Sequence, residues 1–66
     1  MTTPPLPLPN IGRPATRALE AIGITDLHQV AGLTEKGLLA LHGVGPKAVG
    51  ILRYALATRG MAFAED

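Results

Sequence analysis

At 66 residues, 47% of them hydrophobic, and with a net charge of +1, the chain is long enough for one small domain but too short to enclose a catalytic cleft of ordinary size. The absence of cysteine excludes a disulfide framework and a cysteine-based zinc site. No apolar run approaches the roughly 18 residues that cross a bilayer, and the N-terminus lacks the pattern of a signal peptide. We therefore expect a soluble cytoplasmic protein that is not an enzyme and uses no metal or cofactor.

Residues 1–9 hold four of the six prolines and are predicted to form an extended arm. Proline lacks the N–H donor that a helix needs, and it restricts the residue before it. Pro4-Pro5-Leu6-Pro7 fits the P-x-x-P pattern of ligands for polyproline-binding domains. The alternative is that Leu6 and Leu8 pack on the core while the prolines stiffen the approach. The arm is thus expected to be either a ligand for a partner or a brace of the domain.

Helical spacing of apolar residues after the arm predicts four short helices. Pro14 and Pro46 suit the first turn of a helix, Thr25 and Thr34 are expected to cap the two helices between them, and Gly60 ends the last one. No strand pattern is present, so we expect an all-α domain, a compact bundle of four short helices. The expected helices span 14–22, from the Thr25 cap to about 31, 35–41 after the Thr34 cap, and 46–59.

The buried side of the last two helices also follows from the spacing. In the third helix we expect Leu38, Leu39 and Leu41 to face the core. In the last helix the inward positions are expected to be Val49, Leu52, Leu56 and either Ala48 or Ile51. The tail over residues 61–66 is expected to be flexible and acidic at its end.

The chain contains an internal repeat at a spacing of 33 positions, which lays residues 8–19 over residues 41–52. A glycine and the apolar residue before it recur at the mouth of a helix in both copies. The chain is therefore predicted to contain two related units. The matched pairs are Leu8 with Leu41, Ile11 with Val44, Gly12 with Gly45, Ala15 with Ala48, and Leu19 with Leu52.

The second copy, "LLALHGVGPKAVGIL", resembles a helix-hairpin-helix motif, with Gly43-Val44-Gly45 as the hairpin and Pro46-Lys47 at the start of the second helix. In the first copy Asn10 replaces the first glycine and the proline arm replaces the preceding helix. Over residues 8–60 the arrangement is also similar in shape to the C-terminal domain of the RNA polymerase alpha subunit. The resemblance implies a SAM-like, tandem helix-hairpin-helix domain over residues 10–60, with an incomplete first unit, that binds DNA.

The residues of the hairpins suit an anion. Glycine at 43 and 45 lets another chain or a phosphate approach the main chain, and a branched residue at Gly45 is expected to resist the required backbone angles. The helix N-terminus that follows offers unpaired amides to a phosphate, while Val44 anchors the loop. The predicted DNA-binding residues are Gly12, Arg13, Arg17, Gly43, Gly45, Lys47 and Ala48.

Two such sites facing the same way would contact phosphates of double-stranded DNA. Contacts to the backbone position a protein without reading sequence, so we expect weak, salt-dependent binding of little sequence specificity. The polymerase domain contacts DNA at positions that here carry Pro14, Arg17 and Ala48, which favours backbone contacts alone. The alternative function is a protein-interaction adaptor that uses the hairpin face or the proline arm. The residues leave the choice between DNA and RNA open.

Overall fold

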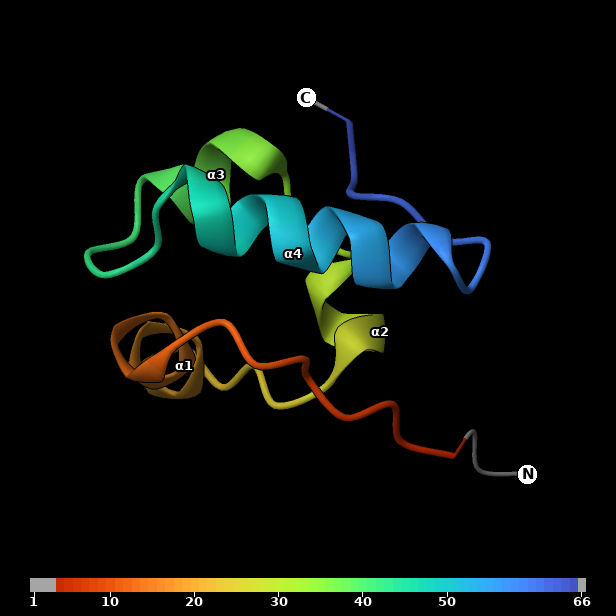
Figure 1. Cartoon of the computed structure of the whole chain (residues 1–66), viewed down its shortest axis with the longest axis horizontal. Coiled ribbons are helices and arrows are strands. Elements are labelled where there is room, and N and C mark those ends of the chain that lie inside the picture. Colours follow the sequence, from red (N-terminus) through yellow and green to blue (C-terminus); the bar gives the residue numbers. More distant parts are fainter. Residues whose placement is uncertain (1–3, 66) are drawn as a thin grey trace.

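The computed structural model describes residues 4–65, and within this range it contains four helices and two isolated β-bridges but no strand. The prediction of an all-α domain of four short helices is confirmed. The longest helix packs against the second and the third, and the first is seen end-on beneath it (Figure 1). The helices are α1 (Arg13–Ala21), α2 (Leu27–Val30), α3 (Glu35–Leu39) and α4 (Pro46–Ala57).

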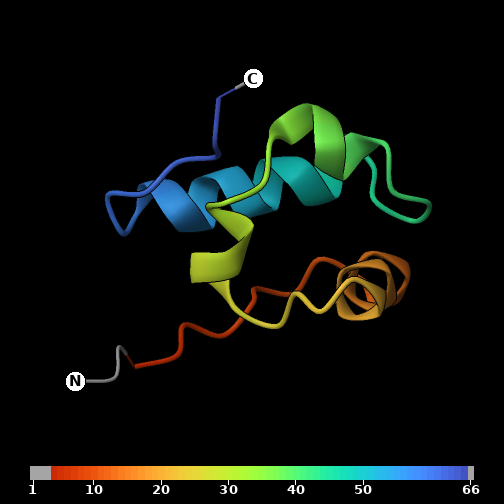
Figure 2. The same cartoon turned by 180° about the vertical axis from the view of Figure 1, so that it is seen from behind.

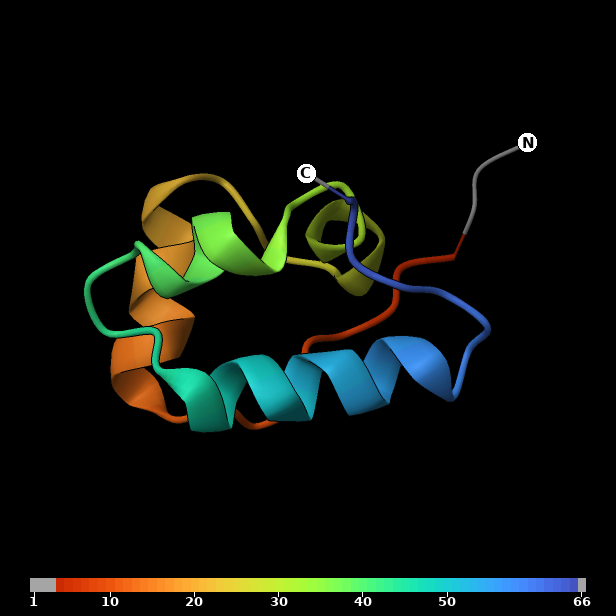
Figure 3. The same cartoon turned by 90° about the horizontal axis from the view of Figure 1, so that it is seen from above.

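The arrangement places the starts of α1 and α4 at the same end of the molecule. Seen from above, α4 runs along one side, α2 and α3 lie on the other, and α1 closes the end near the α3–α4 loop (Figure 3). From behind, the same loop projects over α1, while the C-terminal end of α4 lies at the opposite end of the domain (Figure 2). None of the described helices has the length and apolar character needed to cross a membrane.

The core takes side chains from every helix and from both segments that precede α1 and α4. Among residues 4–65 no polar or charged side chain is buried, so packing of apolar groups accounts for the interior. The side chains that are fully buried are the largest contributors to this packing, since each buried leucine or valine stabilises the fold by about 1.5–3 kcal/mol. They are Leu19, Leu27, Val30, Leu38, Val49, Leu52 and Leu56.

The predicted inward faces are mostly confirmed. In α4 the fourth inward position is Ala48, 6% exposed, whereas Ile51 is half-buried. The prediction for Leu39 was wrong, because α3 ends at this residue and its side chain is 44% exposed. In so short a helix only Leu38 is fully buried, and Leu41 is half-buried beyond the helix end.

Of the two predicted caps of the short helices, one is confirmed and the other is wrong. Thr34 caps α3 as predicted, since its Oγ1 accepts a hydrogen bond from the Gly37 amide at 2.9 Å. The cap of α2 is Asp26 rather than Thr25, with Asp26 Oδ1 accepting from the His28 amide at 2.6 Å. Thr25 lies one residue before this cap, and its amide donates to Gln29 Oε1.

Asp26 also holds the proline arm. The Leu6 amide donates to Asp26 Oδ2 at 2.7 Å, and the Leu27 amide donates to the Leu6 carbonyl at 3.0 Å. Leu6 and Leu8 are half-buried and pack against the core, as the bracing alternative expects, while Pro4, Pro5 and Pro7 are exposed. A single carboxylate therefore caps α2 and fastens the arm.

Acidification should loosen this junction. The hydrogen bond from the Leu6 amide is the largest effect on Asp26, and it lowers the pKa of this carboxyl below its usual 3.8. Partial burial of the carboxylate opposes this shift, and the hydrogen bonds from the amide and the ring of His28 add to it. A carboxylate with a lowered pKa contributes stability above its unfolded-state pKa, and the contribution is lost as the pH falls through the folded value. We expect the melting temperature to fall between about pH 5 and pH 2, and Asp26→Asn to flatten this dependence. Circular dichroism melts at each pH measure the effect. Glu20→Gln, at an exposed carboxylate, should leave the slope unchanged.

The segment after α4 returns along the domain. The Ala64 amide donates to the Leu33 carbonyl at 2.9 Å, and Met61 and Phe63 are half-buried against the core. The residues expected to form a flexible tail are thus tied to the α2–α3 connection at Ala64. Asp66, the last acidic residue of the predicted tail, lies outside the described residues.

Candidate functional site

The repeat found in the sequence extends to the geometry of the helix starts. α1 begins at Arg13 and α4 at Pro46, which are 33 positions apart, and their N-caps are Gly12 and Gly45. Burial repeats with the same spacing. The pairs buried in both copies are Ile11 with Val44, Ala15 with Ala48, and Leu19 with Leu52, and Leu8 and Leu41 are both half-buried.

The loop of the second copy, residues 43–45, lies directly against the first turn of α1. A Cβ atom on Gly43 would come within 2.8 Å of the Pro14 carbonyl oxygen, and Gly43 has a φ of +94°. Both facts require glycine, because a side chain at this φ is strained and has no room. The two copies of the repeat therefore contact each other where Gly43 of the second copy lies against Pro14 of the first.

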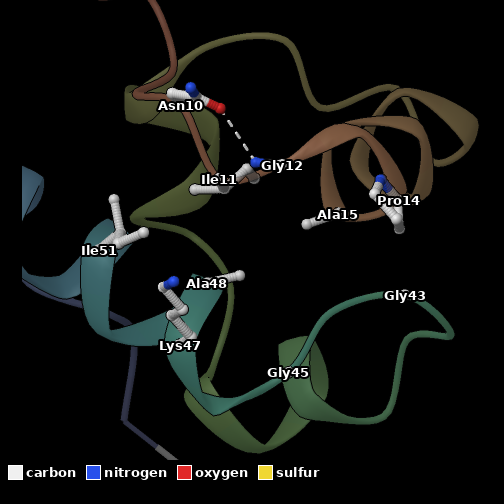
Figure 4. A pocket seen from close by; sticks show the side chains of 10 residues that line it. All are labelled: Asn10, Ile11, Gly12, Pro14, Ala15, Gly43, Gly45, Lys47, Ala48 and Ile51. Carbon is white, nitrogen blue, oxygen red and sulfur yellow. Dashed lines mark hydrogen bonds between the residues drawn. The ribbon is translucent and has the colours of Figure 1, made fainter.

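A hollow of about 440 Å³ lies between the two loops (Figure 4). Both copies contribute to it, through the residues just before each helix and through the first turns of α1 and α4. The predicted site residues that it brings together are Gly12, Gly43, Gly45, Lys47 and Ala48, and the other lining residues are Asn10, Ile11, Pro14, Ala15 and Ile51.

The predicted basic residues are accessible but are not all in the hollow. Lys47 is exposed, lines the hollow and extends along α4 toward the loop of the first copy (Figure 4). Arg13 and Arg17 are exposed on α1 but do not line the hollow. None of the three makes an ion pair with a residue of the described chain. The guanidinium of Arg53 on α4, by contrast, pairs with the Glu35 carboxylate.

The start of α4 leaves backbone donors open. Gly45 provides no side-chain cap, and the first backbone hydrogen bond of the helix runs from the Val49 amide to the Gly45 carbonyl, at 3.1 Å. The amides of Lys47 and Ala48 therefore have no acceptor within residues 4–65, as expected for the first turn of a helix. The Ala48 side chain is buried, so this residue can offer only its amide.

The first copy is closed by its own side chains. The Gly12 amide donates to Asn10 Oδ1 at 3.1 Å, and the Gly12 carbonyl accepts from the amide and the hydroxyl of Thr16, at 3.0 and 2.8 Å. Sequence reasoning treated Asn10 only as a substitute for glycine. Asparagine two residues before a helix-capping glycine is itself a signal, because its side chain commonly bonds the backbone two residues on.

The expectation that Gly45 needs special backbone angles was wrong. Gly45 has φ −110° and ψ −179°, an extended conformation open to any residue, and a Cβ atom there would meet no atom within 4 Å. The restricted glycine of this loop is Gly43. Gly45 instead leaves free space beside the start of α4.

The hollow thus combines open amides, a lysine ammonium and apolar walls from both copies of the repeat. Comparisons with models of protein families, with curated proteins and with solved structures gave no match. Chemically, the arrangement suits an extended ligand that carries anionic groups beside apolar ones.

Proposed function

We propose that this chain is a non-enzymatic DNA-binding protein that contacts the phosphate backbone of a duplex with little sequence specificity. In this proposal the fold is a SAM-like, tandem helix-hairpin-helix domain whose first unit is incomplete. One observation carries the proposal: the loops at the starts of α1 and α4, which are 33 positions apart, open onto the same hollow. Two helix starts on one hollow, one with open amides and the other followed by exposed arginines, suit a polymer with regularly spaced phosphates better than a single small anion.

The second loop supplies the stronger part of the argument. A phosphate at the start of α4 would accept hydrogen bonds from the open amides of Lys47 and Ala48 and would lie near the Lys47 ammonium. The dipole of a twelve-residue helix favours an anion at this end. The missing side chain of Gly45 leaves room for a sugar-phosphate chain to approach.

The charge distribution supports backbone contact. Arg13 and Arg17 follow the first loop and Lys47 follows the second, and all three are exposed. Of the four described acidic residues, Glu35 pairs with Arg53 and Asp26 bonds His28 and Leu6, while Glu20 and Glu65 are exposed and do not line the hollow. If three phosphates are neutralised, log K should fall against log salt with a slope of about −2 to −3.

A titration tests the proposal. Isotope-labelled protein is mixed with a short DNA duplex at low and at moderate salt, and the backbone amide signals are followed. We expect the signals of Gly43, Gly45 and Lys47 to shift at low salt and the effect to weaken as salt rises, while Gly32 and Gly60, outside the hollow, stay still. No shift at low salt would refute DNA binding and favour the adaptor alternative. A parallel titration with duplex RNA distinguishes the two nucleic acids.

A further inference from the structure

The amide at the mouth of the first loop is already occupied. Gly12 is exposed, and its N–H points to the Asn10 side chain, whose Oδ1 accepts at 3.1 Å (Figure 4). Asn10 is exposed as well and lines the hollow together with Lys47. A carboxamide oxygen therefore lies where the first loop would otherwise present a backbone donor to solvent.

The second loop has no such occupant. The residue that matches Asn10 at the 33-position spacing is Gly43, which has no side chain, and Gly45 has no side-chain cap. The residue that matches Thr16 is Val49, which bonds the Gly45 carbonyl through its amide alone. The first loop thus satisfies the Gly12 amide with its own side chain, whereas the Gly45 amide of the second loop has no acceptor among the described residues.

We propose that Asn10 competes with DNA: its side-chain oxygen takes, at the Gly12 amide, the place that a phosphate oxygen would take. The inference rests on the proposed function, since it concerns the same surface. Both oxygens accept from the same N–H, so a phosphate can use this donor only after the Asn10 side chain turns away. The first loop then contributes through the arginines of α1 and the second loop makes the main backbone contact.

Removal of the competing oxygen should tighten binding. An exposed hydrogen bond between neutral groups has a modest net strength, so we expect Asn10→Ala to lower the Kd for a short duplex by about three-fold to ten-fold. The Gly12 amide, little affected by DNA in the unmodified chain, should then shift strongly on addition of the duplex. Asn10→Asp keeps the acceptor and adds a negative charge, so it should weaken binding by about three-fold or more.

A matched control is available at Gln29, a residue that does not line the hollow. Gln29 is also exposed, and its side-chain oxygen also accepts a backbone amide, that of Thr25 at 2.7 Å, away from the hollow. Gln29→Ala should therefore leave the Kd unchanged. Thermal melts of all variants show whether the domain remains folded, and Asn10→Asp, which retains the acceptor for Gly12, keeps the comparison usable if Asn10→Ala loosens the start of α1.

The outcomes separate this inference from the function on which it rests. If the unmodified chain responds at Gly45 and Lys47 and Asn10→Ala binds more tightly, the competition is supported. If the unmodified chain responds but Asn10→Ala binds equally or more weakly, Asn10 is no competitor, and DNA binding itself stands. If the unmodified chain gives no response to the duplex, both proposals are overturned.

Discussion

Gly43→Ala should destabilise the domain by about 2–6 kcal/mol. A side chain at φ +94° carries backbone strain of about 1–3 kcal/mol, and the new Cβ would lie 2.8 Å from the Pro14 carbonyl oxygen, an overpacking that costs a further 1–3 kcal/mol or so. A domain of this size has a free energy of unfolding of only about 3–10 kcal/mol. Thermal and urea unfolding should therefore show a fall in Tm of about 10 °C or more.

Gly45→Ala is the matched control, since it adds the same methyl group two residues later in the same loop. Its backbone is extended, with φ −110°, and a Cβ there meets no atom within 4 Å. We expect a change of less than about 1 kcal/mol, set mainly by the poorer capping preference of alanine. Equal losses for the two variants would show that the contact between the second loop and α1 does not constrain the fold.

Lys47→Glu should weaken binding to a short duplex by about ten-fold or more at low salt, because it replaces a charge-assisted phosphate contact with repulsion. The slope of log K against log salt should become shallower by about one, since one phosphate contact is lost. The fold should be retained, because the Lys47 side chain is exposed and makes no ion pair with the described residues. Fluorescence anisotropy of a labelled duplex at several salt concentrations measures both quantities.

Lys36→Glu makes the same change of charge at an exposed residue of α3 that does not line the hollow. Its effect should be less than about two-fold, since solvent and salt screen a charge that contacts no phosphate. If both variants weaken binding equally, net charge rather than the loop at the start of α4 governs the interaction. If neither does, Lys47 is not part of the interface.

Much of the fold could be predicted because its signals are local. Pro14 and Pro46 lie in the first turns of α1 and α4, and Thr34 caps α3, as their backbone preferences dictate. The cap of α2 was missed because Thr25 and Asp26 are adjacent candidates and a distant group decides between them. The Leu6 amide binds the Asp26 carboxylate, which fixes that residue at the junction of arm and helix.

The candidate site also has features that the sequence indicated and features that it did not. The 33-position repeat indicated that Gly12 and Gly45 occupy equivalent positions at helix starts. In the structure they are the N-caps of α1 and α4, and both line the hollow. The repeat could not show which glycine of the second loop is restricted, since Gly43 is constrained by Pro14, a residue far away in the sequence. Nor could it show that Asn10 closes the first loop, because a comparison of the two copies registers only that glycine is missing there; the signal for this bond is the position of Asn10 two residues before Gly12.

The attachment of Leu6 and Ala64 near α2 affects the order in which the domain can fold during synthesis. α2 has only four residues, too few to be stable alone, and it is flanked by the Leu6 contacts on one side and by the bond from Ala64 to Leu33 on the other. A growing polypeptide on the ribosome cannot complete this assembly until Ala64 has emerged. The domain therefore completes its packing only after residue 64 has been synthesised, and loss of the Leu6 or the Ala64 contacts should loosen the middle of the domain.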